Sequence, residues 1–246
     1  PATFNYLSVR ADRLKAMLRD IYLSIGYRGE LATDDIHDVL SPRLPNMQQA
    51  ASLLSAVTAE TASVIASLPR HCRIEHLIAA HNQISTNTYA LFKFLSGSRP
   101  LEFETVTRSQ INLKTGETGI TDKRVSPYHE LRLICLPKYL VRWLETYTQW
   151  LSSLAYRLSG IAPKLAAQID SMTGAQLPAD WHPLFFTLSE TMESLPIGSR
   201  ALARVLMDNG MAINAGRHWV DAMARDAGID SAAIMGQAGR GSPGQE

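Results

Sequence analysis

The chain has 246 residues, of which 46% are hydrophobic and 19% charged, so it can bury a sizeable core and bulk disorder is excluded. Its formal net charge of +1 excludes a histone-like polycation and leaves room for a local basic groove. The two cysteines, Cys72 and Cys135, cannot form a disulfide framework, which favours a reducing, cytoplasmic location. No apolar run approaches the roughly 18 residues of a membrane span, and the N-terminus is not a signal peptide, so we expect no membrane partner.

An amphipathic helix is predicted over Arg10–Ile25, where apolar residues recur at helical spacing among basic ones. The basic residues fit either the solvated face of a packed helix or a helix that lies near phosphates. Two prolines within 41–46 break the helical pattern and predict a boundary. The boundary separates an N-terminal helical segment, 1–45, from the larger part of the chain, 46–246.

Helices are predicted on both sides of a short β region. The first two span 47–68 and 74–95, and the second ends at Ser96-Gly97, because glycine is the usual exit from a helix. Further helices are expected around 140–154, 199–209, 215–227 and 231–235.

Three short strands are expected between these helices. Val106–Leu113 and Gly119–Asp122 flank a good turn at 114–117, and Leu131–Leu136 follows. Three short strands are too few for a domain sheet, so we expect a small antiparallel layer on a helical body. The predicted fold class is mainly α with a small three-stranded antiparallel sheet (α+β).

Several familiar chemistries lack their sequence patterns. The chain has no G-x-x-x-x-G-K-[ST] phosphate loop, no G-x-G-x-x-G and no G-x-S-x-G. His71, His76 and His81 are five residues apart, which does not place them on one helix face, and no H-E-x-x-H occurs. We therefore expect neither a nucleotide-binding loop nor a metal site.

Three cations stand in specific local contexts. Arg99 directly follows the helix over 74–95, Lys123 comes at the end of the second strand, and Arg217 begins a helix. Taken singly, each arginine fits a surface ion pair, and the lysine fits a solvated hairpin residue. Together they suit a phosphodiester, because guanidinium groups hold the non-bridging oxygens and a lysine can protonate a leaving oxygen.

In this order and context, the sequence resembles the catalytic domain of the tyrosine recombinases, the phage-integrase family of site-specific DNA recombinases. The segment 91–102 is similar to the family's first-arginine box, with Arg99 as its arginine and Glu102 as the acidic residue that follows. The hairpin with Lys123 is similar to the region that carries the catalytic lysine, and 132–137 to the strand after it.

Two later segments extend the resemblance. The segment 214–219 resembles the H-x-x-R box, with Arg217 as the second arginine, and 234–237 resembles the L-G-H box. Asn214 and Gln237 stand where these boxes have histidines; both can donate hydrogen bonds but neither titrates near pH 7. His218 matches a histidine often found after the arginine, and its plain structural role would be helix packing.

The family's nucleophile has no counterpart in these residues. The family places a tyrosine roughly ten or more residues after the L-G-H box, whereas the last tyrosine here is Tyr156. Either the chain is cut just before the nucleophile, or it is a recombinase-like protein without one. The absent initiator methionine and the Gly-rich finish at 239–246 favour truncation. Under the resemblance, residues 1–45 are either the end of an N-terminal DNA-binding domain or part of the catalytic body.

The resemblance implies phosphoryl transfer through a 3′-phosphotyrosyl DNA intermediate, with no metal or cofactor. Arg99 and Arg217 would clamp the scissile phosphate, and Lys123 would protonate the 5′-oxygen. Asn214 and Gln237 would add hydrogen bonds, while Glu102 would orient Arg99. The implied partner is double-stranded DNA, with self-assembly on paired sites.

Two other functions fit the sequence. The first is a catalytically inactive, recombinase-like DNA-binding protein, which Asn214, Gln237 and the missing tyrosine favour. The second is a helical interaction protein without a nucleic-acid role, which the weak net charge favours.

Overall fold

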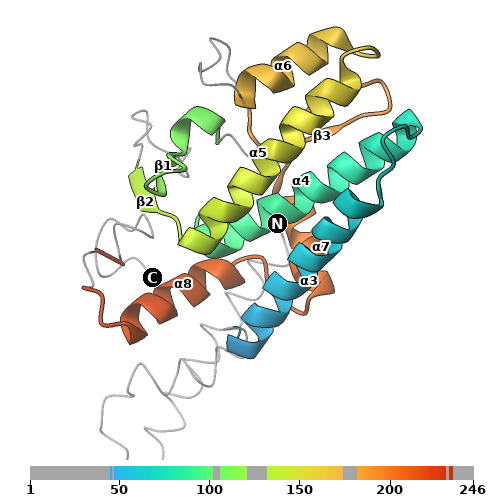
Figure 1. Cartoon of the computed structure of the whole chain (residues 1–246). Coiled ribbons are helices and arrows are strands. Elements are labelled where there is room, and N and C mark those ends of the chain that lie inside the picture. The colour runs from blue at the N-terminus through green and yellow to red at the C-terminus, as the bar shows by residue number, and fades with distance from the viewer. Residues whose placement is uncertain are drawn as a thin grey trace, which may run out of the picture. The chain divides into compact units, whose positions relative to one another are not determined.

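A computed structural model of the chain describes residues 45, 47–101, 106–120, 132–173, 182–230 and 233–234. Contacts group residues 45–246 into one unit and residues 1–44 into another. The predicted helix Arg10–Ile25 lies outside the described residues. In the larger unit, several helices pack around one central helix (Figure 1).

The central helix is α4 (Ile74–Ser96), which follows α3 (Met47–Ser67) after a short loop. The helices that come later in the chain are α5 (Lys138–Leu158), α6 (Pro163–Thr173), α7 (Ser199–Asp208) and α8 (Ala215–Asp226). Most of α4 is buried, because α3, α5, α7 and α8 all pack against it. The helices predicted over 47–68, 74–95, 140–154, 199–209 and 215–227 are thus confirmed, with ends that differ by a few residues.

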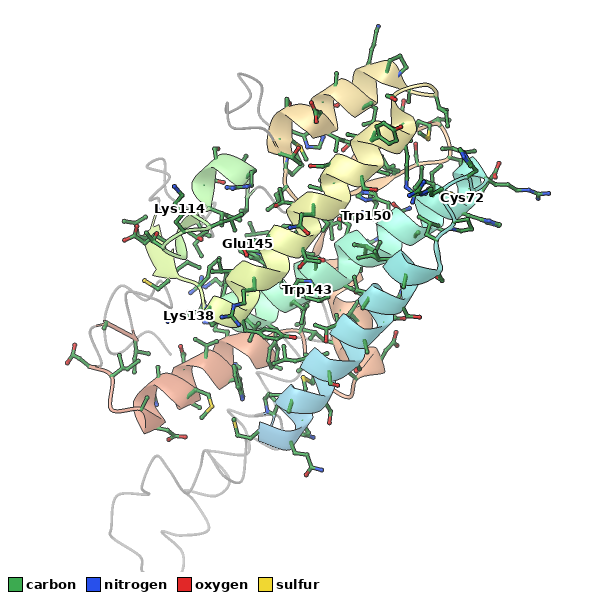
Figure 2. The ribbon with its side chains drawn as sticks, in the orientation of Figure 1. Cys72, Lys114, Lys138, Trp143, Glu145 and Trp150 are labelled. Carbon is green, nitrogen blue, oxygen red and sulfur yellow. The ribbon has the colours of Figure 1, made fainter. Side chains whose placement is uncertain are left out.

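The apolar stripe of α5 forms much of the core. Its buried residues include Leu140, Leu144, Tyr147, Leu151 and Leu154. Burying each such side chain stabilises the fold by roughly 1.5–3 kcal/mol before the entropy of ordering it is counted. Trp143 and Trp150, labelled in Figure 2, donate hydrogen bonds to Thr88 and His81 of α4, so α5 is also aligned on α4 by polar contacts.

A buried histidine connects three segments. The indole N–H of Trp150 donates to Nδ1 of His81 (3.2 Å), so the proton of the neutral ring sits on Nε2, which faces the Phe186 carbonyl oxygen at 3.1 Å. Burial lowers the pKa of His81 to about 3, and the bond to Phe186 opposes that shift. His81 is therefore neutral in the fold at ordinary pH and serves the core.

The β layer that comes between α4 and α5 in the sequence is smaller than predicted. β1 (Glu117–Ile120) pairs antiparallel with β2 (Arg132–Cys135), from Glu117 opposite Cys135 to Ile120 opposite Arg132. The mainly α class with a small antiparallel sheet is confirmed. Within the described ranges, however, this sheet has two strands, and the predicted third contributes only a bridge between Ile111 and Thr118.

The strand predicted over Val106–Leu113 is wrong because local side-chain bonds satisfy its backbone. The segment contains the short 3-10 helix η1 (Arg108–Gln110). The Gln110 side chain accepts a hydrogen bond from the Thr107 amide (2.7 Å), and Arg108 Nη1 donates to the Ile111 carbonyl (2.7 Å). Such bonds compete with ladder formation.

A second strand pair escaped the sequence analysis. β3 (Phe186–Leu188) pairs antiparallel with β4 (Ser194–Pro196), and β3 packs on α4. Strands of three residues are too short for an alternating pattern to be recognised. Of the helix predicted over 231–235, residues 233–234 are described and are helical.

From sequence we expected no segment that could span a membrane, and α3 departs from that expectation. Among the described residues it is the one helix that has the length and apolar composition to do so. In the structure, its residues Ala50, Leu53 and Val57 are buried, and Glu60 accepts hydrogen bonds from Gln83 and Asn87 of α4 at 2.7 and 2.9 Å. These contacts make α3 a packing partner of α4.

Candidate functional site

Arg99 stands just beyond a tightly defined end of α4. Gly97 ends the helix with φ +63°, a left-handed conformation that glycine adopts without strain. The hydroxyl of Ser96 accepts from the Ser98 amide (3.2 Å) and donates to the Ser98 hydroxyl (2.8 Å). The exit is thus fixed, and the Arg99 side chain emerges exposed to solvent.

Arg217 lies in the first turn of α8, whose start is pressed against the last turns of α4. A Cβ placed on Gly216 would lie 2.4 Å from Phe94 Cα and 2.6 Å from its carbonyl oxygen, so only glycine permits this approach. Three residues further on, the Trp219 ring stacks on Phe94 with centroids 5.3 Å apart. The segment that bears Arg217 therefore packs on the end of α4 that leads to Arg99 (Figure 1).

The surroundings of Arg217 suit an anion. The residue is half-buried, with its Nη1 atom fully buried, so its charge is less screened than that of a surface arginine. It also lies at a helix N-terminus, where the helix dipole favours negative charge. An oxyanion held between Arg217 and Arg99 would offset the mutual repulsion of the two guanidinium groups.

Asn214 is the residue from which α8 starts. Its main-chain carbonyl accepts from the amides of Arg217 (3.1 Å) and His218 (3.3 Å). Its carboxamide does not cap the helix and hydrogen-bonds to none of the side chains or main-chain groups that the structure describes. The group is half-buried one turn from Arg217 and can donate to a ligand.

His218, the residue after Arg217, is exposed. Its role stays a prediction. The structure brings Arg99, Asn214 and Arg217 to two neighbouring helix ends.

The other predicted site residues, Lys123, Glu102 and Gln237, lie outside the described residues. The connection that contains Lys123 runs between the paired residues Ile120 and Arg132. The position of its two ends is therefore fixed by the β1–β2 pairing.

Lys114 is a second lysine in the β region. From sequence it was predicted to lie in a turn and was given no role in the site. Lys114 is exposed on the turn between Ile111 and Thr118, just before β1 (Figure 2). The turn is rigid: Asn112 Oδ1 accepts from the Lys114 amide (3.0 Å), and Gly116 has φ +80°. An ammonium group on a rigid turn can donate a proton. Lys114 is therefore an alternative to Lys123 as the proton donor to a leaving oxygen. The signal that could have revealed it is the turn itself, which lies inside the predicted hairpin.

No group of three or more histidine, cysteine or acidic side chains that could hold a metal occurs in the described part of the chain. A cavity of about 710 Å³ opens between α3, α4 and α7, lined by polar residues that include Glu60, Asn87 and Arg204. None of the residues predicted for the site lines it.

Comparisons with known proteins give matches in structure alone. No protein-family model and no curated protein sequence matches the chain. The crystal structure of XerA recombinase aligns over 93% of this chain and 74% of its own, with a TM-score of 0.50 and 13% identity. A structure of the Tn1549 transposon integrase in complex with a circular intermediate DNA aligns over 96% and 71%, with a TM-score of 0.48 and 13% identity. The likeness to the first structure establishes the fold.

Proposed function

We propose that this chain, which has the fold of a tyrosine-recombinase catalytic domain, is the catalytic part of a site-specific DNA recombinase or integrase. One observation carries the proposal. The contact of Gly216 with Phe94 seats the first turn of α8, with Arg217, on the end of α4 that leads to Arg99. Two arginines from distant parts of the sequence are thereby presented by neighbouring helix ends, as binding of one phosphate requires.

The proposed chemistry is a transfer of phosphorus between two oxygens. A tyrosine oxygen attacks the scissile phosphate, the bond from phosphorus to the 5′-oxygen breaks, and the 3′-phosphate stays on the tyrosine. Arg99 and Arg217 stabilise the charge that develops on the non-bridging oxygens, and Asn214 and Gln237 add hydrogen bonds. Lys123, with Lys114 as the alternative, donates a proton to the leaving 5′-oxygen. Rejoining is the same step in reverse, with a 5′-hydroxyl as the attacking group.

The nucleophile comes from elsewhere. No tyrosine follows Tyr156 in these 246 residues. Tyr156 itself is exposed in the last turn of α5 and belongs to none of the segments that carry the proposed site. We therefore assign the attacking oxygen to a tyrosine on further polypeptide or on another protomer assembled on the same DNA.

Duplex DNA is the proposed partner, bound chiefly through its phosphates, with self-assembly on paired sites. Because the net charge is only +1, Arg99, Arg217 and the β-region lysines must act as a local cluster. Binding should therefore depend strongly on salt.

A non-catalytic DNA-binding protein is the second candidate function. Asn214 favours it, since a non-titrating carboxamide stands three residues before Arg217 in the sequence, where a histidine could carry a proton. Both functions need the phosphate clamp, which is Arg99 and Arg217 bound to one phosphate. They differ in whether a covalent bond forms between the protein and the DNA. A covalent complex between nicked DNA and the product of the complete reading frame would exclude this candidate.

The clamp can be tested with the chain as it is. Arg99→Ala and Arg217→Ala should each weaken retention of a DNA duplex and reduce the slope of log affinity against log salt by about one. Arg73→Ala is the matched control, because Arg73 is an exposed arginine at the opposite end of α4. Equal affinities for all three variants would refute the proposed function.

A further inference from the structure

We propose that Lys93 is a positioning residue for Arg99: its buried ammonium group fixes the main chain from which the Arg99 side chain reaches the phosphate. The inference rests on the proposed role of Arg99 in phosphate binding. Lys93 lies within the segment 91–102, in which the sequence pointed only to Arg99 and Glu102.

Lys93 is 4% exposed, although lysine is among the residues least often buried. Its Nζ donates a hydrogen bond to the carbonyl oxygen of Arg99 at 3.0 Å. Residues six apart are not neighbours on a helix, so this bond exists only because the chain turns back at Gly97. The lysine therefore spans from the helix to the residue that follows its exit.

Two features of the surroundings of the Lys93 ammonium favour a charge there. The ammonium lies 5.8 and 5.9 Å from the ring centroids of Tyr89 and Phe92, within the range of cation–π attraction. It also lies at the C-terminal end of α4, where the helix dipole favours a cation. An ordinary apolar residue at 93 could fill the space but could not bind a carbonyl.

The exit of α4 is thus held at successive points. Gly97 sets the direction of the chain, the hydroxyls of Ser96 and Ser98 bond to each other, and Lys93 binds the Arg99 carbonyl. The Arg99 side chain is exposed, so its own packing does little to restrict it. Anchoring its main chain reduces the conformational freedom that phosphate binding would otherwise have to remove.

A double-mutant cycle tests whether Lys93 acts through Arg99. The affinity of the chain for a DNA duplex is measured at several salt concentrations for wild type, Lys93→Met, Arg99→Ala and the double variant. Lys93→Met should weaken binding about tenfold, the size of one charge-assisted hydrogen bond. It should weaken binding no further once Arg99 is alanine. Thr88→Val is the control, since Thr88 is buried on the same helix and bonds to Ile84 and Trp143 rather than to the exit.

The outcomes separate the two proposals. Loss of affinity in Arg99→Ala with none in Lys93→Met overturns the positioning role and leaves the clamp intact. Losses that simply add, or an equal loss in Thr88→Val, show a general effect on folding and also overturn it. Unchanged affinity in Arg99→Ala refutes the proposed function itself. If Lys93→Met does not fold, Lys93→Arg decides: a cationic donor should keep affinity within about twofold of wild type, and a tenfold loss contradicts the role.

Discussion

Gly216 of α8 and Phe94 of α4 approach so closely that a methyl group on Gly216 would lie 2.4 Å from the Phe94 Cα atom. This contact sets the distance between the helix that begins near Arg217 and the helix that ends before Arg99. The spacing of Arg99 and Arg217 in the proposed phosphate clamp therefore depends on this contact between α4 and α8.

Gly216→Ala should separate the two helix ends. The added carbon meets main-chain atoms, which cannot rotate away, so α8 must move, at a cost of about 1–3 kcal/mol. Chemical denaturation should show that loss of stability. DNA affinity measured where the variant is fully folded should fall as well, because Arg217 moves with α8.

Gly160→Ala is the control for this substitution. A Cβ at Gly160 meets nothing within 4 Å, so stability and DNA affinity should stay near wild type. Unchanged DNA affinity in folded Gly216→Ala would show that the crossing does not set the clamp.

Arg217→Lys tests whether geometry or charge matters at the start of α8. Lysine keeps the charge but loses the planar fork that binds two phosphate oxygens, and it cannot place a nitrogen where the buried Nη1 lies. We expect Arg217→Lys to bind DNA almost as weakly as Arg217→Ala. At the exposed Arg99, where the side chain is less confined, Arg99→Lys should keep more of the affinity. Equal retention by the two lysine variants, in binding titrations at one salt concentration, would contradict this difference.

Helix positions could be predicted from sequence because periodic apolar residues report directly on packing. Leu140, Leu144, Leu151 and Leu154 are buried in α5 as their spacing indicates. The structure of the segment 106–113 could not be predicted from sequence, and the expected strand is absent there. The hydrogen bonds of Thr107 and Gln110 that replace the strand pairing depend on local geometry. Propensity describes a residue's average surroundings, and two side-chain bonds can outweigh it.

The candidate site was only partly predictable for a similar reason. Arg99 and Arg217 stand in recognisable sequence contexts, and the structure brings their helix ends together. The bond from Lys93 to Arg99 was not foreseeable, because an apolar-flanked lysine gives no pattern that distinguishes burial from exposure. The contact between Gly216 and Phe94 could not be predicted either, because the two residues are more than a hundred positions apart in the sequence.

Lys123 and Lys114 can be separated by the leaving group. The general acid is needed because an alkoxide leaves poorly without a proton, whereas a thiolate leaves readily. Replacing the 5′-bridging oxygen of the DNA by sulfur should therefore restore cleavage to the variant that lacks the acid. We expect rescue of Lys123→Ala and little effect on Lys114→Ala. The assay needs the tyrosine, so it uses the product of the complete reading frame; rescue of Lys114→Ala alone would move the role to the turn before β1.

Burial keeps His81 neutral in the core, which predicts a dependence of stability on pH. Burial lowers the folded-state pKa to about 3 from the ordinary 6.5, so between these values the unfolded chain binds a proton that the folded chain does not. This contribution to stability is complete above pH 6.5 and is lost as the pH falls towards 3. The free energy of unfolding should drop by about 2 kcal/mol from this residue between pH 7.5 and 5.

Urea denaturation of His81→Gln at pH 7.5, 6 and 5 measures that contribution. The variant should be less stable than wild type at pH 7.5 but should lose less stability on acidification. His71→Gln, the same substitution at an exposed histidine, is the matched control. His182, whose pKa burial also lowers, acts in the same direction and is present in both variants, so it cancels in the comparison. If His81→Gln loses as much stability between pH 7.5 and 5 as wild type does, then His81 is not the group that titrates on unfolding, and burial does not hold it neutral.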